Sequence, residues 1–376
     1  MKILQVCSAR TIGGGEKHVA DLANGLASRG QEVHVALRPG SSLRSELTIL
    51  PVSHIHPLRA TGPLNLLNAF PLARLIRKRG VELVHAHIAH DYLLAATAVR
   101  LAGRGRVVLT RHALFPLSKV YRVALGRVSR VIAVSEAVAD RVRSDNIFDV
   151  ADIEVVHNGV DLARFKPNVG AGEDARSLFQ AGPRDFYLVG MTGHLAPIKG
   201  PDLFIRAAAV VARLRDDVTF VVAGEDKSRS GENRRRLERL VGDLGLGGRV
   251  RLPGWVDDVP SLLSALDLFV SPSRSEPFGL SIVEAMACGA PVVATKSEGA
   301  CEILDDGVTG LLVPPGDHEA LAEAICALLD DRVRRASLAA RALEAVRDRF
   351  SLERMVTATE RLYRSVLGVR GGRASG

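Results

Sequence analysis

Residues 267–295 have the sequence DLFVSPSRSEPFGLSIVEAMACGAPVVAT, and this stretch determines how the rest of the chain is interpreted. It opens with a short apolar run at 268–270 and passes through a turn-rich segment. A helical pattern follows from about Phe278 to Cys288, ends at Gly289, and gives way to a second apolar run at Pro291. A strand, a helix and a second strand in this order predict a βαβ unit with parallel strands, so the fold class is α/β.

Two glutamates bracket the first turn of this helix, Glu276 before it and Glu284 within it. Glu276 is placed at the carboxyl edge of a parallel sheet, where open α/β folds bind ligands. The amides of Phe278, Gly279 and Leu280 suit an anion such as phosphate, whereas a carboxylate beside them suits hydroxyl groups. The pattern favours a ligand with hydroxyls on both sides of a diphosphate. The alternative is that Glu276 caps the helix and Glu284 is a solvated helix residue.

The string E-P-F-G-L-x-x-x-E-A-M-A-x-G-x-P-V-V-A-T resembles the donor-site signature of family 4 glycosyltransferases, which are retaining enzymes of the GT-B fold. The resemblance extends over nearly the whole chain. It implies two Rossmann-like β/α/β domains that face each other across a cleft. Residues 1–166 would form the N-terminal, acceptor-binding domain, with the C-terminal helix in 352–376 crossing back to it. Residues 167–351 would form the domain that binds a nucleotide-sugar.

Length and composition fit a two-domain globular protein with a large core, because the chain has 376 residues of which 47% are hydrophobic. Its four scattered cysteines form no C-x-x-C pair, which argues against a zinc site or a disulfide framework and fits a reducing cytosol. No apolar run is long enough to span a bilayer, and no signal peptide is expected.

The net charge of +8 is concentrated in the first half of the chain, where residues 1–168 carry 23 Lys and Arg against 13 Asp and Glu. Such asymmetry suggests an anionic partner: a membrane surface, a nucleic acid or an acidic acceptor. The alternative is ordinary solubility charge. Nucleic acid is not favoured, because an aromatic content of 4% is low for base stacking.

A glycine-rich loop at 13–15 follows the first predicted strand, and we expect a helix from Lys17 to about Arg29. The loop could cradle phosphate, but its glycines are consecutive, and no carboxylate for a ribose follows the second strand. The G-G-G-E-K-H-V run resembles the N-terminal loop of family 4 glycosyltransferases. The resemblance implies that Gly14 and Gly15 approach the diphosphate or sugar and that Glu16 faces the acceptor.

Histidines cluster after the strand at 82–86, as His85, His87 and His90. We do not expect a metal here, because Asp91 is the one acidic residue nearby. Family 4 members often carry a histidine-rich segment at this point, and His90 is expected to line the cleft. His112 follows the strand at 106–110 in a segment that resembles the family's T-x-H motif. The resemblance implies that His112 faces the reacting sugar; the alternative is a structural loop histidine.

The loop at 193–200, G-H-L-A-P-I-K-G, follows a predicted strand and places a cation where a diphosphate could bind. It resembles the family's G-R-x-x-x-x-K-G loop, whose Arg and Lys neutralise the leaving diphosphate in place of a metal. Lys199 matches this pattern. His194 stands where the arginine is usual, and imidazole lacks a bidentate fork and titrates near neutrality. Further along, Gly224 ends a strand at a ligand-binding edge, and the segment at 250–256 resembles the one that would place Val256 against the base.

Two basic amphipathic segments, 63–79 and 117–128, are predicted as helices that could contact anionic lipid, although the first is more simply a core-facing helix.

Together these features predict a retaining, metal-independent glycosyltransferase. Its donor would be a nucleotide-diphosphate sugar, with a UDP-sugar favoured and GDP-mannose second. Its acceptor would be lipid-linked, a lipopolysaccharide or a polysaccharide. Glu276, Lys199 and His112 are the expected catalytic residues, and no cofactor is expected. An epimerase or phosphorylase on the same fold, and a non-enzymatic basic docking protein, are the alternatives. The expected location is cytoplasmic, including the inner face of the cytoplasmic membrane.

Overall fold

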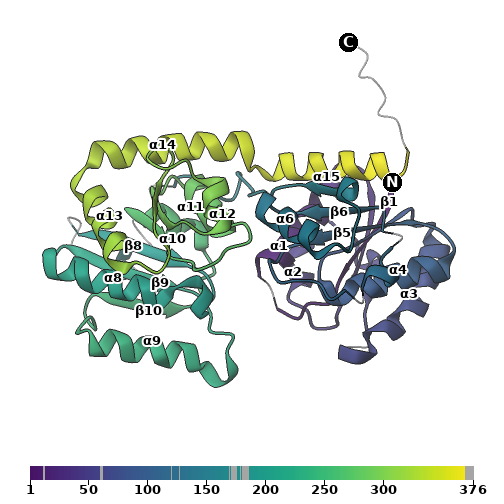
Figure 1. The fold of residues 1–376 in the computed structure, drawn as a ribbon, viewed down its shortest axis with the longest axis horizontal. Helices are drawn as coiled ribbons and strands as arrows, with labels where there is room; N and C mark the ends of the chain where they lie inside the picture. Colours follow the sequence, from purple (N-terminus) through teal and green to yellow (C-terminus); the bar gives the residue numbers. More distant parts are fainter. Residues whose placement is uncertain are drawn as a thin grey trace, which may run out of the picture. The chain divides into compact units, whose positions relative to one another are not determined.

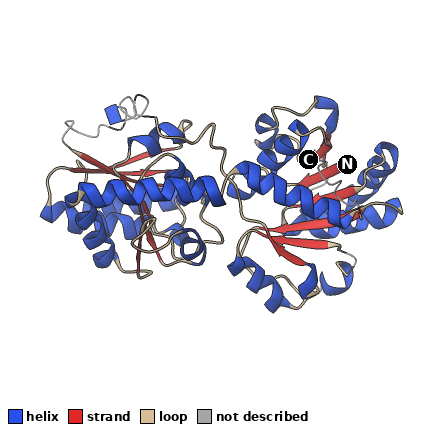
Figure 2. Ribbon diagram, turned by 90° about the horizontal axis from the view of Figure 1, so that it is seen from above, coloured by secondary structure: helices blue, strands red, loops and turns tan. Residues whose placement is uncertain are grey.

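The structure is a computed structural model that describes residues 1–11, 13–59, 62–119, 121–126, 128–168, 170, 176–177, 179 and 186–368. The chain divides into two compact units. Unit 1 comprises Met1–Gly159 and the segment that begins at Leu352, and unit 2 comprises Val160–Ser351. Both are α/β, with the strands of each sheet lying between helices (Figure 1, Figure 2). Much of the expected interdomain hinge, at 166–184, lies outside the described residues.

Unit 1 is built on a parallel seven-stranded sheet with the order β3-β2-β1-β4-β5-β6-β7. Its strands are β1 Lys2–Cys7, β2 Glu32–Leu37, β3 Ile55–Pro57, β4 Leu83–Ala86, β5 Arg106–Arg111, β6 Arg130–Ala133 and β7 Ile153–Val155. Its helices are α1 Gly14–Ser28, α2 Leu43–Glu46, α3 Ala69–Arg79, α4 Ala89–Ala102, α5 Tyr121–Ala124, α6 Glu136–Asp145 and α15 Leu352–Val366.

The strands of unit 1 are apolar on both faces, because helices cover both sides of the sheet. Along β1, Ile3 packs into a cluster with α1 and α15, whereas the next residue, Leu4, packs with α3 and α4 on the opposite face. The C-terminal helix α15 lies tightly on α1: a Cβ at Gly25 would sit 2.6 Å from a methyl group of Val356. This contact explains why glycine occupies the middle of α1.

Unit 2 is built on a parallel six-stranded sheet with the order β10-β9-β8-β11-β12-β13. Its strands are β8 Tyr187–Thr192, β9 Val218–Ala223, β10 Val250–Gly254, β11 Leu268–Ser271, β12 Val292–Thr295 and β13 Leu311–Val313. Its helices are α8 Pro201–Leu214, α9 Glu232–Asp243, α10 Val259–Ala265, α11 Leu280–Ala287, α12 Glu298–Ile303, α13 His318–Asp330 and α14 Arg332–Arg349.

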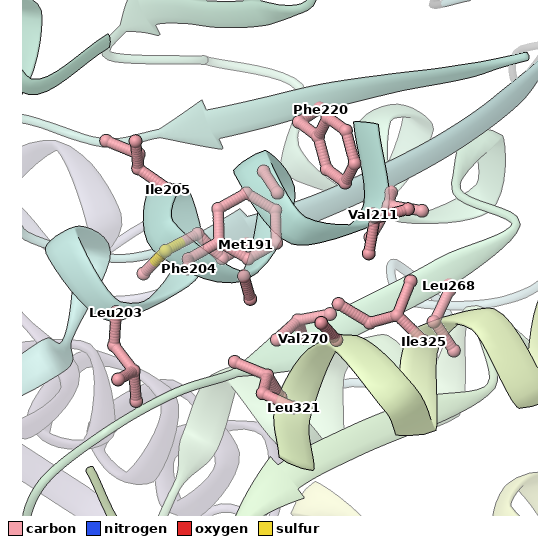
Figure 3. Close-up of a cluster of buried hydrophobic side chains, with 14 of the residues drawn as sticks. Met191, Leu203, Phe204, Ile205, Val211, Phe220, Leu268, Val270, Leu321 and Ile325 are labelled. Atoms are coloured by element: carbon pink, nitrogen blue, oxygen red, sulfur yellow. The ribbon is translucent and has the colours of Figure 1, made fainter. Parts of the chain in front are cut away.

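One face of the unit 2 sheet packs against α8 and α13 (Figure 3). Phe204 of α8 and Phe220 of β9 meet edge to face, with ring centroids 5.9 Å apart. Val270 of β11 and Ile325 of α13 are fully buried in the same cluster. This core fixes the strands whose carboxyl ends carry the predicted donor site.

Both sheets reverse their strand order at one point, between β1 and β4 in unit 1 and between β8 and β11 in unit 2. At such a switch point the connections leave toward opposite faces of the sheet, so the loops at the carboxyl ends of the two strands diverge. Each unit therefore has one switch point of the kind at which open α/β folds bind ligands.

Three predicted segments differ from the structure. Helix α1 begins at Gly14 rather than Lys17, since glycines are tolerated at a helix start, where Glu16 complements the helix dipole. Residues 63–68 belong to a 3-10 segment, and the α-helix begins only at Ala69. There Asn65 donates a hydrogen bond to Asp91. The expected helix at 117–128 is reduced to the four residues of α5, with positions 120 and 127 outside the described residues.

Candidate functional site

The loop that follows β8 carries Lys199 and is fastened to the loop that follows β11. Gly200 has φ +69°, and a Cβ there would lie 2.0 Å from the carbonyl oxygen of Pro272, so the two loops touch where glycine is required. Arg274 of the second loop donates its backbone N–H to the carbonyl of Ile198 at 2.8 Å. Its guanidinium binds both carboxylate oxygens of Asp202, at 2.9 and 2.7 Å. These contacts join the carboxyl ends of the two strands at the switch point.

Lys199 and Glu276 form an ion pair at this junction, with Nζ 2.6 Å from Oε2. The Glu276 carboxylate is nearly buried, with 8% of its side chain exposed, whereas 29% of the Lys199 side chain is exposed. Ser273 donates a second hydrogen bond to the same carboxylate oxygen at 3.2 Å. A carboxylate held by a cation and a hydroxyl keeps a fixed position.

The backbone of Glu276 is held in turn by α12. Its N–H donates to Oε2 of Glu298 at 3.1 Å, and its carbonyl accepts from the N–H of Gly299 at 2.8 Å. A Cβ at Gly299 would lie 2.0 Å from the carbonyl oxygen of Phe278, so the close approach of these segments depends on glycine. Glu276 is thus positioned by two neighbouring loops as well as by its own.

Helix α11 starts at Leu280, shortly after Glu276, and its N-cap residue is a glycine, which has no side chain to cap the helix. Its N-cap residue, Gly279, has φ +107° and ψ 49°, a conformation that a residue with a side chain adopts only with strain. An uncapped helix start beside a lysine is a favourable position for an anion. Glu284 lies further along α11 and is half-buried.

The end of β9 closes the opposite side of the β8 loop. Gly224 has φ +155°, and a Cβ there would lie 1.7 Å from the carbonyl oxygen of Gly193. His194 is half-buried, and burial together with the charges of Lys227 and Lys199 lowers the pKa of its imidazole. The ring is therefore neutral at pH 7 and can donate one hydrogen bond, whereas the arginine expected at this position would carry a charge. Val256 is half-buried after β10.

The switch point of unit 1 has a different chemistry, because buried histidines gather there. His18 of α1, His87 after β4 and His112 after β5 each place one ring nitrogen within 4.8 Å of the other two. His18 and His87 are buried, and His112 is half-buried. Burial lowers the pKa of His18 to about 4 and holds the pKa values of the other two well below the ordinary value, so all three rings are neutral at pH 7.

Comparison with known proteins identifies the family. The model of the family "Glycosyl transferases group 1" matches residues 176–345, and that of "Glycosyltransferase Family 4" matches residues 12–164. A D-inositol 3-phosphate glycosyltransferase of Salinispora tropica is 33% identical over 92% of this chain and 79% of its own length. The chain belongs to glycosyltransferase family 4.

Other similar proteins support the same family assignment. The lipopolysaccharide core biosynthesis mannosyltransferase LpsB of Rhizobium meliloti is 31% identical over 77% of this chain and 78% of its own length. The crystal structure of HepE from Anabaena in complex with UDP and glucose has a TM-score of 0.86 and 28% identity, covering 97% of this chain and all of that one. The enzyme is thus a glycosyltransferase, and its two parallel sheets have the GT-B fold.

Within this glycosyltransferase the structure brings the predicted donor residues of unit 2 into one region. Lys199, Glu276 and Gly279 lie on the two connected loops at the β8–β11 switch point. Gly224 contacts the start of the same β8 loop. Their roles in donor binding stay predictions.

The predicted site residues of unit 1 do not all lie together. A Cβ at Gly15 would lie 3.5 Å from the ring of His112, so these two are adjacent. Gly14 and His90 are exposed, and Glu16 is half-buried. His85 is a structural histidine: it is fully buried, with Nδ1 bonded to the hydroxyl of Tyr363 and Nε2 to that of Thr110.

Sequence reasoning missed four residues that surround these histidines: His18, Gln5, Asn158 and Tyr363. Gln5 is a polar residue in the middle of an otherwise apolar strand, and this was a usable signal of a buried polar network. His18 lies on the buried face of α1, with 4% of its surface exposed. Tyr363 comes from α15, more than three hundred residues from the strands it contacts, and no local pattern could have placed it there.

Proposed function

We propose that this enzyme is a retaining glycosyltransferase that moves a sugar from a nucleotide-diphosphate sugar to a lipid-linked, lipopolysaccharide or polysaccharide acceptor. The names of the relatives support this class of reaction, since they include D-inositol 3-phosphate glycosyltransferases and lipopolysaccharide core enzymes. A UDP-sugar is the first candidate donor because HepE was crystallised with UDP-glucose. GDP-mannose is the second, because LpsB is named a mannosyltransferase.

The observation that carries the proposal is the Lys199–Glu276 pair beside the uncapped start of α11. Transfer leaves a nucleoside diphosphate whose new negative charge is the largest that develops in the reaction. Preorganised donors aimed at such a charge are commonly the largest single contribution to catalysis. Lys199, a neutral His194 and the amides at 278–280 would supply them, so this chemistry requires neither a metal at the diphosphate nor a resident cofactor.

Glu276 would act on the sugar rather than on the phosphate. When Lys199 turns toward the diphosphate, the carboxylate can accept hydrogen bonds from sugar hydroxyls while Ser273 and the α12 backbone contact hold it in place. Glu284, further along α11, would bind the ribose. A direct attack from the face of the departing group retains the anomeric configuration without an enzymatic nucleophile, so Glu276 need not form a covalent bond.

Unit 1 would bind the acceptor, with His112 on that side. We also propose that it meets an anionic membrane surface. Exposed apolar side chains occur in two of its segments that pack on α4: Leu66, Leu67 and Phe70 before and within α3, and Phe115 and Val123 around α5. Exposed basic residues flank them, at Arg74, Arg77, Lys78, Lys119 and Arg122. No helix among the described residues is long and apolar enough to cross a membrane.

A thermal-shift panel tests the donor site. UDP, GDP and ADP, each with a common sugar conjugate, are added to the full-length enzyme with a chelator present. We expect one diphosphate to raise the melting temperature, Lys199→Ala to abolish that shift, and Arg213→Ala on the exposed side of α8 to leave it unchanged. Glu276→Gln should keep the shift with the diphosphate but lose the added shift with the sugar conjugate. A shift that survives Lys199→Ala would contradict the proposed diphosphate site.

A further inference from the structure

We propose that His18, His87 and His112 form a binding site for a divalent transition-metal cation of the zinc class, lying wholly within unit 1. One nitrogen from each ring lies within 4.8 Å of the other two. Three points with such separations always lie within about 2.8 Å of a common centre, and a zinc–imidazole bond is about 2.0–2.1 Å long. Shifts of up to about 0.8 Å by each nitrogen toward that centre would therefore complete the three bonds.

Hydrogen bonds indicate which ring nitrogen of His18 and of His87 keeps a lone pair for a cation. Nδ1 of His18 is 2.8 Å from Oδ1 of Asn158, an oxygen that can only accept, so this nitrogen carries the proton and Nε2 is left with its lone pair. In the same way Nε2 of His87 donates to Oε1 of Gln5 at 2.6 Å, which leaves the lone pair on Nδ1. Metal-binding histidines are oriented by hydrogen bonds of this kind, from the second ring nitrogen to an oxygen.

One further nitrogen of each histidine has no hydrogen-bond partner. Nε2 of His18, Nδ1 of His87 and Nε2 of His112 are all buried, and no described group forms a hydrogen bond with any of them. Buried polar atoms are nearly always paired, so three unpaired nitrogens in one place point to a bound group. A cation bound there would accept one lone pair from each ring.

The donor set selects the metal. Neutral imidazoles suit zinc, copper, iron and nickel, whereas magnesium and calcium prefer oxygen ligands. Three histidines leave the fourth position of a tetrahedral site open. The cations proposed to stabilise the diphosphate, Lys199 and its neighbours, belong to unit 2, whereas all three histidines belong to unit 1.

A second histidine cluster in unit 1 provides the contrast. His34, His54 and His56 also lie close together, with ring centroids 4.2 and 5.2 Å from that of His34. None of their described ring nitrogens, however, is both buried and unpaired: His34 contacts Glu32 and His56, and Nδ1 of His54 lies 2.9 Å from the carbonyl oxygen of Val33. His54→Gln is therefore a matched control for substitutions in the first cluster.

Metal binding itself is the readout. The purified full-length enzyme is stripped with a chelator, its metal content is measured by elemental analysis, and it is titrated with Zn²⁺ against a chromophoric competitor and with Co²⁺ by visible absorption. We expect one equivalent per chain and the absorption of a four-coordinate Co²⁺ complex. His18→Gln and His87→Gln should each weaken Zn²⁺ binding at least tenfold, while His54→Gln leaves it unchanged.

A second part of the experiment tests the residues whose oxygens orient the histidine rings. Gln5→Met keeps the length of the side chain but removes the oxygen that fixes the tautomer of His87, so Zn²⁺ affinity should fall about 10–100-fold. Circular dichroism of each stripped variant identifies any that have lost the fold. Absence of a saturable site in the parent enzyme would overturn the proposal. If His18→Gln weakened Zn²⁺ binding no more than His54→Gln does, the metal would have to bind outside the cluster of His18, His87 and His112.

Discussion

The two units have the same strand order up to the sixth strand, yet their switch points carry opposite kinds of chemistry. At the β8–β11 position of unit 2, Lys199 and Glu276 form a charged pair beside an uncapped helix. At the β1–β4 position of unit 1, buried histidines are held neutral. Topology thus determines where a ligand can bind in each unit, whereas the side chains at the strand ends determine what binds. A charged edge suits a diphosphate, and a neutral edge suits hydroxyls or a soft cation.

Removal of the Lys199 side-chain charge in unit 2 should have the largest effect on catalysis. Lys199→Ala should lower kcat by about 10²–10³-fold, the usual effect of deleting one donor to a developing negative charge. Steady-state kinetics with the donor identified by thermal shift measures the change. Arg213→Ala is the control, and a Lys199→Ala enzyme with nearly normal kcat would show that the charged edge of unit 2 does not stabilise the leaving group.

The junction of the two unit 2 loops should be the next most sensitive feature. Gly200→Ala places a Cβ 2.0 Å from the Pro272 carbonyl in a left-handed conformation, so the enzyme should be destabilised by on the order of 3 kcal/mol. Gly242→Ala, in α9 with nothing near its Cβ, should instead stabilise by about 0.5–1 kcal/mol. Denaturant titration compares the two, and equal effects would contradict a required close approach.

Acidification should lower the stability of unit 1 more than that of unit 2. Between pH 6.5 and about 4 the unfolded chain binds a proton at His18 whereas the folded chain does not, so stability decreases as the pH falls through this window. At pH 5 this one group should cost about 2 kcal/mol, with further loss from His85, His87 and His112. Above pH 6.5 both states are neutral and the effect vanishes.

Hydrogen exchange at pH 7.5 and pH 5, corrected for the intrinsic rate, resolves this difference by unit. Peptides from α1 and β4 should lose more protection than peptides from α8 and β9. His18→Gln should reduce the pH dependence in unit 1. Equal loss of protection in both units would show that the histidine cluster does not distinguish them.

The smallest expected effect concerns the surface of unit 1. Lys78→Gln and Lys119→Gln should each weaken binding to anionic vesicles by about 1 kcal/mol, or roughly fivefold, and the loss should diminish as salt increases. Flotation with anionic and neutral vesicles measures it, and Arg213→Gln in unit 2 is the control. Binding that is unaffected by either substitution would exclude these segments as the membrane contact.

The sequence predicted unit 2 better than unit 1, and the reason is physical. In unit 2 the groups at the site come from short loops next to their strands, so a local pattern such as G-x-x-x-x-x-K-G or E-P-F-G carries the information. In unit 1 the histidine site is assembled from α1, β4 and β5, and Gln5, Asn158 and Tyr363 support it from three further places. The spacing of His85, His87 and His90 does not show how these residues separate: His85 is structural, His90 is exposed, and only His87 lies in the cluster with His18 and His112.

The sequence by itself determined the α/β class, the two parallel sheets, the family and the loops that carry Lys199 and Glu276. These follow from local periodicity and short motifs, because strand, turn and helix form between residues near one another in the chain. Only the tertiary structure decided that Lys199 pairs with Glu276, that three histidines converge, and which of their nitrogens lack partners. Each of these depends on distances between strands that are adjacent in the sheet but distant in sequence, and strand order is a property of the folded chain.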